Sequence, residues 1–345
     1  MSDPNQIVQR HLKRIVEHSA TLTRSEAAEL LRAVFHADDS PAAHLRIAAL
    51  LGALAARGET AAEIAGFVDA MRAAATPVPV DEPERALLVD TCGTGGDQSG
   101  TFNISTAAAL VAAAAGARVA KHGNRAVTSR SGSADVLEAL GIPVDLDPEE
   151  AATALRTHGF AFLHAPTLHP ALRTVMPIRR ALGVRTVFNI LGPMSNPAGA
   201  PAQVMGVYAA RLVPLVAEAL ATLGTRHAFV VHGAGELDEI SLCGPSQIAE
   251  IRDGKVTLST FVPEDVGLQQ APLQALAGGD ATANAAILRA IFAGQTGAPR
   301  DVVVLNAAAV LVTAALAPNL RAGVELAQRT IDSGQVTALV LRLSQ

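Results

Sequence analysis

The sequence predicts an α/β fold, with a small helical domain at the N-terminus and a larger α/β domain after it. Three observations lead to this prediction. The chain has 345 residues, half of them apolar, which is more than a single hydrophobic core usually holds. The first quarter carries the start and stop signals of short helices. The remainder alternates short apolar runs with alanine-rich segments, as chains of alternating strands and helices do.

Residues 7–76 are predicted to form about four short helices. Two positions show the spacing of a capping box ahead of an apolar-periodic run. These are Thr23 with Glu26 and Thr60 with Glu63. Residues 76–84 then contain three prolines. Because proline disfavours helix at its own position and at the preceding one, we expect an extended linker here.

The predicted α/β part begins at residue 86. Candidate strands are 86–89, 118–120, 160–163, 203–208, 227–231 and 302–305, and candidate helices are 105–115, 133–140, 147–158, 212–223 and 283–293. Asp253-Gly254 between the apolar runs 248–251 and 255–259 predicts a hairpin, so we expect some antiparallel pairing. The longest apolar stretch, 302–317, is shorter than a bilayer-spanning helix needs. We interpret it as a buried strand leading into a buried helix.

Composition argues against several classes of protein. The net charge is 27 − 32 = −5 and no block of five like charges occurs, so no nucleic-acid partner is predicted. Cys92 and Cys243 are the only cysteines, which fits a reducing compartment and gives no disulfide or zinc framework. The N-terminus lacks the order of a signal peptide. We therefore expect a cytoplasmic protein with no membrane segment.

A glycine-rich loop is the first candidate binding site. Residues 90–97, Asp-Thr-Cys-Gly-Thr-Gly-Gly-Asp, hold three glycines in four positions and lie between a predicted strand and the helix that opens at 103–106. Glycines let amide groups approach a ligand closely, and a helix N-terminus attracts anions. The pattern matches neither a Walker A loop nor the Rossmann fingerprint. It indicates a phosphorylated ligand, with an ordinary flexible turn as the alternative.

Two further groups favour the same chemistry. Residues 121–125, Lys-His-Gly-Asn-Arg, follow a strand directly, and 128–135 add hydroxyls and glycine. Such groups at the carboxyl end of a parallel strand suit a phosphate, and a solvated basic loop is the alternative. The adjacent carboxylates Asp238 and Glu239 suit Mg²⁺ near a phosphate. A pair of exposed acids is the alternative interpretation.

Four arginines lie within thirteen positions on a predicted helix and its end. They are Arg173, Arg179, Arg180 and Arg185. A guanidinium group could hold a small carboxylate there. We expect at least two of the four simply to face water. The ten histidines show no HExxH spacing, so no zinc site is predicted.

Taken in order, these motifs resemble the anthranilate phosphoribosyltransferase family of nucleoside-phosphorylase-like transferases. The series is GTGGD, NIST, KHGNR, SGS, the segment from His169 to Pro193 and the Asp-Glu pair, and the resemblance covers nearly the whole chain. The ordered series is specific, whereas GTGGD and the basic loop recur in looser form in pyrimidine nucleoside phosphorylases. The resemblance implies transfer of the 5-phosphoribosyl group of phosphoribosyl pyrophosphate (PRPP) to the amine of anthranilate. The products would be N-(5-phosphoribosyl)anthranilate and diphosphate, in tryptophan biosynthesis and with Mg²⁺ as cofactor.

The resemblance also implies an architecture and an assembly. A small helical domain, residues 1–78 with about 168–192 packing back onto it, would be hinged to a large α/β domain formed by 79–167 and 193–345. The large domain would hold a mixed, mainly parallel sheet flanked by helices. The substrates would bind in the cleft between the domains, and the chain would form a homodimer.

Site residues follow by matching motif to motif. PRPP would be held by Gly93, Gly96, Asp97, Thr101, Asn103, Ile104, Ser105, Thr106, Lys121, Ser129 and Ser133. The anthranilate-binding site would be lined by Gly93, His122, Asn124, Arg179 and Pro193. Magnesium would be bound by Ser105, Asp238 and Glu239. No residue is expected to bond covalently to substrate. One departure is Gln98, where the family's motif commonly has glycine.

Two other functions are weighed against this one. A nucleoside phosphorylase of the same superfamily would need neither the Asp238-Glu239 pair nor the segment around Arg179. A catalytically silent homologue that binds nucleic acid or another ligand is disfavoured by the acidic net charge and the intact motif series.

Overall fold

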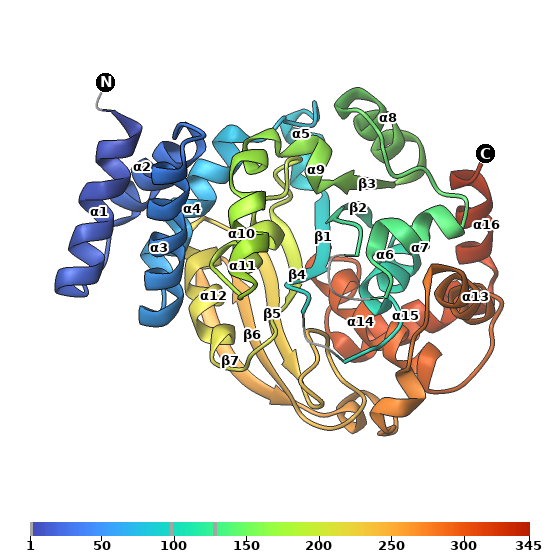
Figure 1. The fold of residues 1–345 in the computed structure, drawn as a ribbon. Coiled ribbons are helices and arrows are strands. Elements are labelled where there is room, and N and C mark those ends of the chain that lie inside the picture. Colours follow the sequence, from blue (N-terminus) through green and yellow to red (C-terminus); the bar gives the residue numbers. More distant parts are fainter. Residues whose placement is uncertain (1–2, 97–98, 127–129) are drawn as a thin grey trace.

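Figure 1 shows the computed structural model, which describes residues 3–96, 99–126 and 130–345. A bundle of N-terminal helices lies at one end of the molecule, the sheet runs through the middle, and further helices cover the sheet (Figure 1). The bundle helices are α1 (Pro4–His18), α2 (Arg24–Phe35), α3 (Pro41–Arg57) and α4 (Ala61–Ala74). The helices predicted over residues 7–76 are confirmed.

Both predicted capping boxes form. Thr60 donates its backbone N–H to Glu63 Oε2 at 2.8 Å, and the Thr60 hydroxyl accepts the Glu63 N–H in return. The Glu63 side chain is fully buried, and its other oxygen accepts bonds from Leu22 N at 2.9 Å and Arg57 Nη2 at 2.6 Å. The Glu63 carboxylate therefore caps α4 and also connects the start of this helix to the end of α3 and to the loop before α2.

The linker differs from its prediction at the end. Residues 76–81 are non-helical, but α5 (Glu82–Ala86) is a short helix. Asp81 caps it by accepting the Glu84 N–H at 2.8 Å. Pro83 falls in the first turn, where a missing N–H costs no hydrogen bond. The expectation that the prolines keep residues up to Glu84 extended was therefore wrong.

The described part of the chain contains a seven-stranded sheet in the order β3-β2-β1-β4-β5-β6-β7. The strands are β1 (Leu88–Gly93), β2 (Arg118–Gly123), β3 (Phe160–His164), β4 (Ala202–Gly206), β5 (His227–Gly233), β6 (Ser246–Arg252) and β7 (Lys255–Phe261). The strands from β1 to β5 pair in parallel, whereas β6 and β7 pair antiparallel. The mixed, mainly parallel sheet and the hairpin turn at Asp253-Gly254 are confirmed.

Alternate strand residues face two different helical layers, as the period of a strand requires. Val204 and Phe229 pack on the side of α6 and α14. Met205 and Val230 face the other side, where α12 separates the sheet from the N-terminal bundle. The helices after β1 are α6 (Ile104–Ala114), α7 (Ser133–Ala139), α8 (Pro148–His158), α9 (Ala165–Leu168), α10 (Met176–Leu182), α11 (Phe188–Met194), α12 (Leu212–Thr222), α13 (Ala281–Phe292), α14 (Ala298–Thr313), α15 (Leu320–Asp332) and α16 (Gln335–Leu343). Short 3₁₀ helices are η1 (Pro170–Thr174), η2 (Pro263–Val266) and η3 (Leu273–Leu276).

The predicted strand 302–305 is wrong, because these residues belong to α14. Every residue from 302 to 313 is buried, and α14 packs against α6, α15 and the sheet. A helix covered on all sides has no polar face, so its sequence shows no helical period and resembles a buried strand. Asn306 is satisfied inside this core by bonds of 2.9 Å between its side chain and the backbone N–H and C=O of Ile240.

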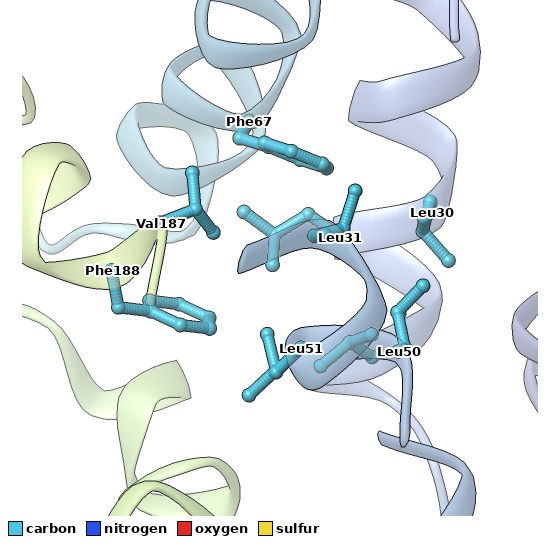
Figure 2. A pocket seen from close by; sticks show the side chains of 9 residues that line it. Leu30, Leu31, Leu50, Leu51, Phe67, Val187 and Phe188 are labelled. Carbon is cyan, nitrogen blue, oxygen red and sulfur yellow. The ribbon is translucent and has the colours of Figure 1, made fainter. Parts of the chain in front are cut away.

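The segment between β3 and β4 returns to the N-terminal bundle. Helices α10 and α11 contact α3 and α4, respectively. Figure 2 shows Val187 and Phe188 pointing toward Leu31, Leu51 and Phe67 of the bundle. The apolar contact fixes this segment against the helical part of the chain. Among the described residues, no helix is both long and apolar enough to cross a membrane.

Candidate active site

The carboxyl ends of three neighbouring strands bring the predicted motifs to one edge of the sheet. Strand β1 lies between β2 and β4, and Gly93 at the end of β1 pairs with Gly206 at the end of β4. The basic segment 121–125 begins inside β2, which ends at Gly123, and continues beyond the strand with Asn124 and Arg125. In parallel sheets this edge is where ligands bind, because the loops and helix N-termini that follow the strands gather there.

The glycine loop packs directly on the Asp238 segment. Gly95 donates its N–H to Asp238 Oδ2 at 2.7 Å, with a φ of +66° that favours glycine. A Cβ added at Gly93 would collide with the Asp238 carboxylate, and one added at Gly206 would collide with its backbone oxygen. The absence of a side chain at Gly93 thus allows the Asp238 segment to pack closely.

The N-terminus of α6 faces the second carboxylate. Ser105 donates its N–H to Glu239 Oε1 at 3.0 Å. Lys121, only 1% exposed, donates from Nζ to the Thr91 carbonyl at 2.6 Å and reaches Ser105 Oγ at 3.5 Å. A buried ammonium group and a helix N-terminus therefore supply positive potential beside the carboxylates.

Asp238, Glu239 and Ser105 are oxygen donors of the kind that would hold a magnesium ion. Each carboxylate contacts an amide of a loop or helix end that is suited to an anion. Within residues 3–96, 99–126 and 130–345, no three His, Cys, Asp or Glu side chains gather as a metal site of their own. Magnesium usually takes one or two protein carboxylates and completes its shell with water and substrate phosphate, so this donor set suits it.

The other residues predicted for PRPP lie around this edge in different ways. Asn103 holds two loops together, donating to Ser131 O at 3.2 Å and accepting from Asn284 Nδ2 at 2.9 Å. Ser133 donates its hydroxyl to Asn124 O at 3.2 Å. Thr101 forms an isolated β-bridge with Ala277, and Gly96 has a positive φ. The side chains of Ile104 and Thr106 are buried. Asp97, Gln98 and Ser129 lie outside the described residues.

Two buried histidines, His122 on β2 and His169 after α9, lie next to each other. The rings of His122 and His169 have centroids 5.0 Å apart. His122 Nδ1 bonds the Gly192 carbonyl at 3.1 Å, whereas Nε2 of both rings is buried without a hydrogen-bond partner. Burial lowers the pKa of His122 to about 3 and that of His169 to about 4. Both rings are therefore neutral at physiological pH, each with one nitrogen unpaired.

A buried carboxylate holds the strand that carries His122. Asp90 Oδ1 accepts the His122 N–H at 3.1 Å, and Oδ2 accepts from Asn196 Nδ2 at 2.8 Å. Burial raises the pKa of Asp90 to about 6. These bonds fix the relative positions of β1, β2 and the loop after α11.

Arg179 lies on α10, where the chain packs back on the bundle. Its guanidinium lies 5.2 Å from the centre of the Phe188 ring and donates to Met176 Sδ at 3.6 Å. Burial lowers the pKa of this guanidinium, and none of the described carboxylates lies within 4 Å of it. No described hydrogen bond joins Arg179 to His122. Arg173, Arg180 and Arg185 are exposed.

Pro193 lies beside the glycine-loop strand. Its carbonyl accepts from Gln203 Nε2 at 2.6 Å and lies 3.9 Å from Cys92 Sγ. The predicted acceptor residues thus divide into Gly93, His122 and Pro193 near the strand ends, Asn124 on the exposed basic loop, and Arg179 on α10.

Two family models match the chain. One, described as the helical bundle domain of a glycosyl transferase family, covers residues 9–75, and the other, its a/b domain, covers residues 85–337. A curated relative from Anaeromyxobacter sp. (strain K), named anthranilate phosphoribosyltransferase, is 52% identical over 328 residues, 95% of each chain. The chain belongs to the anthranilate phosphoribosyltransferase family.

Solved structures of anthranilate phosphoribosyltransferases have the same fold. The enzyme from Thermus thermophilus is 45% identical, with a TM-score of 0.89 over 99% of this chain and 98% of that one. The enzyme from Saccharomyces cerevisiae in complex with PRPP and Mg is 26% identical, with a TM-score of 0.88 over 98% of this chain and 97% of that one. The predicted α/β fold is confirmed.

Sequence reasoning misses two polar residues of this site. His169 opens the His-Pro-Ala motif but is not among the selected residues, because nothing in the sequence places it against His122. Asp90 belongs to the glycine motif but receives no role there. The sequence does contain a signal for Asp90, because it follows an apolar strand segment directly. A carboxylate that is buried there, as Asp90 is, needs hydrogen-bond partners.

Proposed function

We infer that the chain transfers the 5-phosphoribosyl group of PRPP to the amine of anthranilate, releasing diphosphate. The observation that carries this is the meeting of Asp238 and Glu239 with the amides of Gly95 and Ser105 at the sheet edge. Carboxylates and anion-binding amides side by side suit a magnesium diphosphate group. The relatives' name, and the Saccharomyces cerevisiae structures with PRPP and Mg and with 4-fluoroanthranilate, support the same reaction.

On the donor side, the chain stabilises the leaving diphosphate. Asp238, Glu239 and Ser105 would hold magnesium, which would supply charge neutralisation. The Lys121 ammonium and the amides near Gly95 add positive potential where the C1–O bond of PRPP breaks. The other residues assigned to PRPP are Gly93, Gly96, Asp97, Thr101, Asn103, Ile104, Thr106, Ser129 and Ser133.

On the acceptor side, the chain orients a neutral amine. Because His122 is neutral and a carbonyl only accepts, its proton lies on Nδ1 and Nε2 is left as an acceptor for an amine N–H. Arg179 is assigned to the anthranilate carboxylate, and Asn124, Gly93 and Pro193 line the route. As the C1–O bond breaks, the amine nitrogen forms the new bond to C1, without a covalent enzyme intermediate.

We also propose that the chain works as a cytoplasmic homodimer. One body would comprise residues 1–78 with about 168–192, and the other would comprise 79–167 and 193–345. The packing of Val187 and Phe188 on the helical bundle supports the assignment of 168–192. Sedimentation equilibrium of the purified protein tests the dimer, because a monomer mass at micromolar concentration would contradict it.

The activity has a direct test. Anthranilate fluorescence should disappear when PRPP and Mg²⁺ are added to the purified protein, and EDTA should stop the loss. In parallel, pyrimidine nucleosides with inorganic phosphate should give no free base. Nucleoside cleavage without loss of anthranilate would favour the phosphorylase alternative, and no reaction in either assay would favour a silent homologue.

A further inference from the structure

We propose that Arg185 is a positioning residue that anchors the glycine loop and links the loop to the segment that carries Arg179. This inference rests on the proposed function, in which that loop binds PRPP and Arg179 binds anthranilate. In the sequence, Arg185 is only one of several arginines on a predicted helix end. Its contacts give it a separate role.

The first contact is with the loop itself. Arg185 lies between α10 and α11, and its Nη2 donates to the Gly96 carbonyl oxygen. Gly95 and Gly96 have φ values of +66° and +72°, in the left-handed region. Gly95 meanwhile donates its N–H to Asp238. The loop is therefore held through an amide on the Asp238 side and through a carbonyl on the Arg185 side.

The second contact anchors the guanidinium. Arg185 lies over the ring of Tyr208, 4.3 Å from its centre. Tyr208 donates its backbone N–H to Thr94 Oγ1 at 3.0 Å, and Thr94 donates its own N–H to Gly206 O at 2.9 Å. The contacts form a closed ring that begins and ends in the glycine loop. None of the described carboxylates lies within 4 Å of Arg185, so no described ion pair competes with these contacts.

The third element is the segment itself. Arg179 lies six residues before Arg185. Val187 and Phe188, two and three residues after it, are buried against the N-terminal bundle. A displacement of this segment would move the Arg185 guanidinium relative to the Gly96 carbonyl. The arrangement therefore links the acceptor side of the site, and the bundle behind it, to the donor loop.

The test combines kinetics with hydrogen exchange of the ligand-free protein. In Arg185→Met, we expect the KM for PRPP to rise about tenfold, with kcat and the KM for anthranilate changed less than about threefold. Amides of residues 94–96 should exchange faster without any substrate, because the loop has lost an anchor. Arg180→Met, an exposed arginine on the same segment, is the matched control. Arg185→Lys should restore part of the effect.

A double-mutant cycle separates positioning from direct substrate contact. Tyr208→Leu should reproduce part of the Arg185→Met effect, Tyr208→Phe should restore it, and the two losses should not add, because both act through one contact. Additive losses with unchanged exchange in the loop would mean that Arg185 touches PRPP directly, which overturns the proposal. Faster exchange with an unchanged KM for PRPP would instead overturn the assignment of the loop to PRPP. Melting temperatures within a few degrees of wild type confirm folding, and Arg185→Lys replaces a variant that fails to fold.

Discussion

The donor and acceptor sides of the site differ in how their polar groups are satisfied before a substrate binds. On the donor side, the amides of Gly95 and Ser105 already donate to Asp238 and Glu239. On the acceptor side, His122 and His169 each keep a buried nitrogen without a partner. An unmade buried hydrogen bond costs free energy, whereas replacing one bond by another is nearly neutral.

The difference separates two kinds of binding. A diphosphate that takes the amides of Gly95 and Ser105 must displace the two carboxylates, so donor binding is an exchange. The displaced carboxylates are the proposed magnesium ligands, which links the donor to the metal. The proposed contact of anthranilate with His122 would instead add a hydrogen bond to the unpaired Nε2 without breaking one, so acceptor binding would be an addition.

The largest expected effect tests the exchange. In the double variant Asp238→Asn with Glu239→Gln, kcat/KM for PRPP should fall by roughly 10²–10³, because the leaving group loses its magnesium-based stabilisation. Without metal, inorganic diphosphate should nevertheless bind several-fold more tightly than to wild type, because uncharged carboxamides compete weakly for the amides and do not repel the anion. Magnesium titrations of activity and metal-free calorimetry measure both changes.

Glu236→Gln provides the control for this experiment. Glu236 precedes the pair by two residues and its side chain is 81% exposed, so its loss should leave both measurements near the wild-type values. Weaker metal-free binding of diphosphate in the double variant would mean that the carboxylates do not compete for the amides. An unaltered magnesium dependence would remove Asp238 and Glu239 from the metal ligands.

A smaller effect is expected on the acceptor side. Arg179→Ala should raise the KM for anthranilate by about 10- to 100-fold, the range for a lost hydrogen bond to a charged group. The KM for PRPP should change little, because the contacts of Arg179 lie on α10 and α11 and not on the glycine loop. Steady-state kinetics with each substrate varied, and Arg180→Ala as control, give the comparison. An equal rise in both constants would contradict the division into two sides.

Local rules explain what the sequence predicts correctly. Capping boxes and tight turns depend on residues close together in the sequence, so the sequence alone predicts them. Examples are the capping boxes at Thr23 and Thr60 and the turn at Asp253-Gly254. The meeting of the glycine and basic loops follows from one topological fact, that parallel strands end at the same edge. Family resemblance supplies the residue roles, which spacing alone leaves open.

Tertiary packing explains what the sequence does not predict. Helix α14 lacks a polar face because it is covered on all sides, so its sequence resembles that of a strand. His169 meets His122 only after β2, β3 and α9 are in place. From the sequence, Gly93 is interpreted as a residue that lets a ligand approach the backbone. The structure shows that a side chain at Gly93 would also collide with Asp238, which lies 145 residues later in the sequence.

The smallest expected effect concerns the neutral histidines and appears in stability rather than in rate. Burial lowers the pKa of His169 from 6.5 to about 4, so between these values the unfolded chain binds a proton that the folded chain does not. His169 therefore makes the free energy of unfolding fall as the pH drops from 6.5 to 4, by at most about 1.4 kcal/mol per pH unit. Asp90 acts in the opposite direction, because burial raises its pKa to about 6.

The variant His169→Gln isolates the histidine, because Asp90 is present in both proteins. Its free energy of unfolding, measured by urea titration at several pH values between 4 and 6.5, should fall less steeply on acidification than that of wild type. His18→Gln, on the exposed face of α1, is the control. Parallel curves for wild type and His169→Gln would contradict a buried, neutral ring with an unpaired nitrogen.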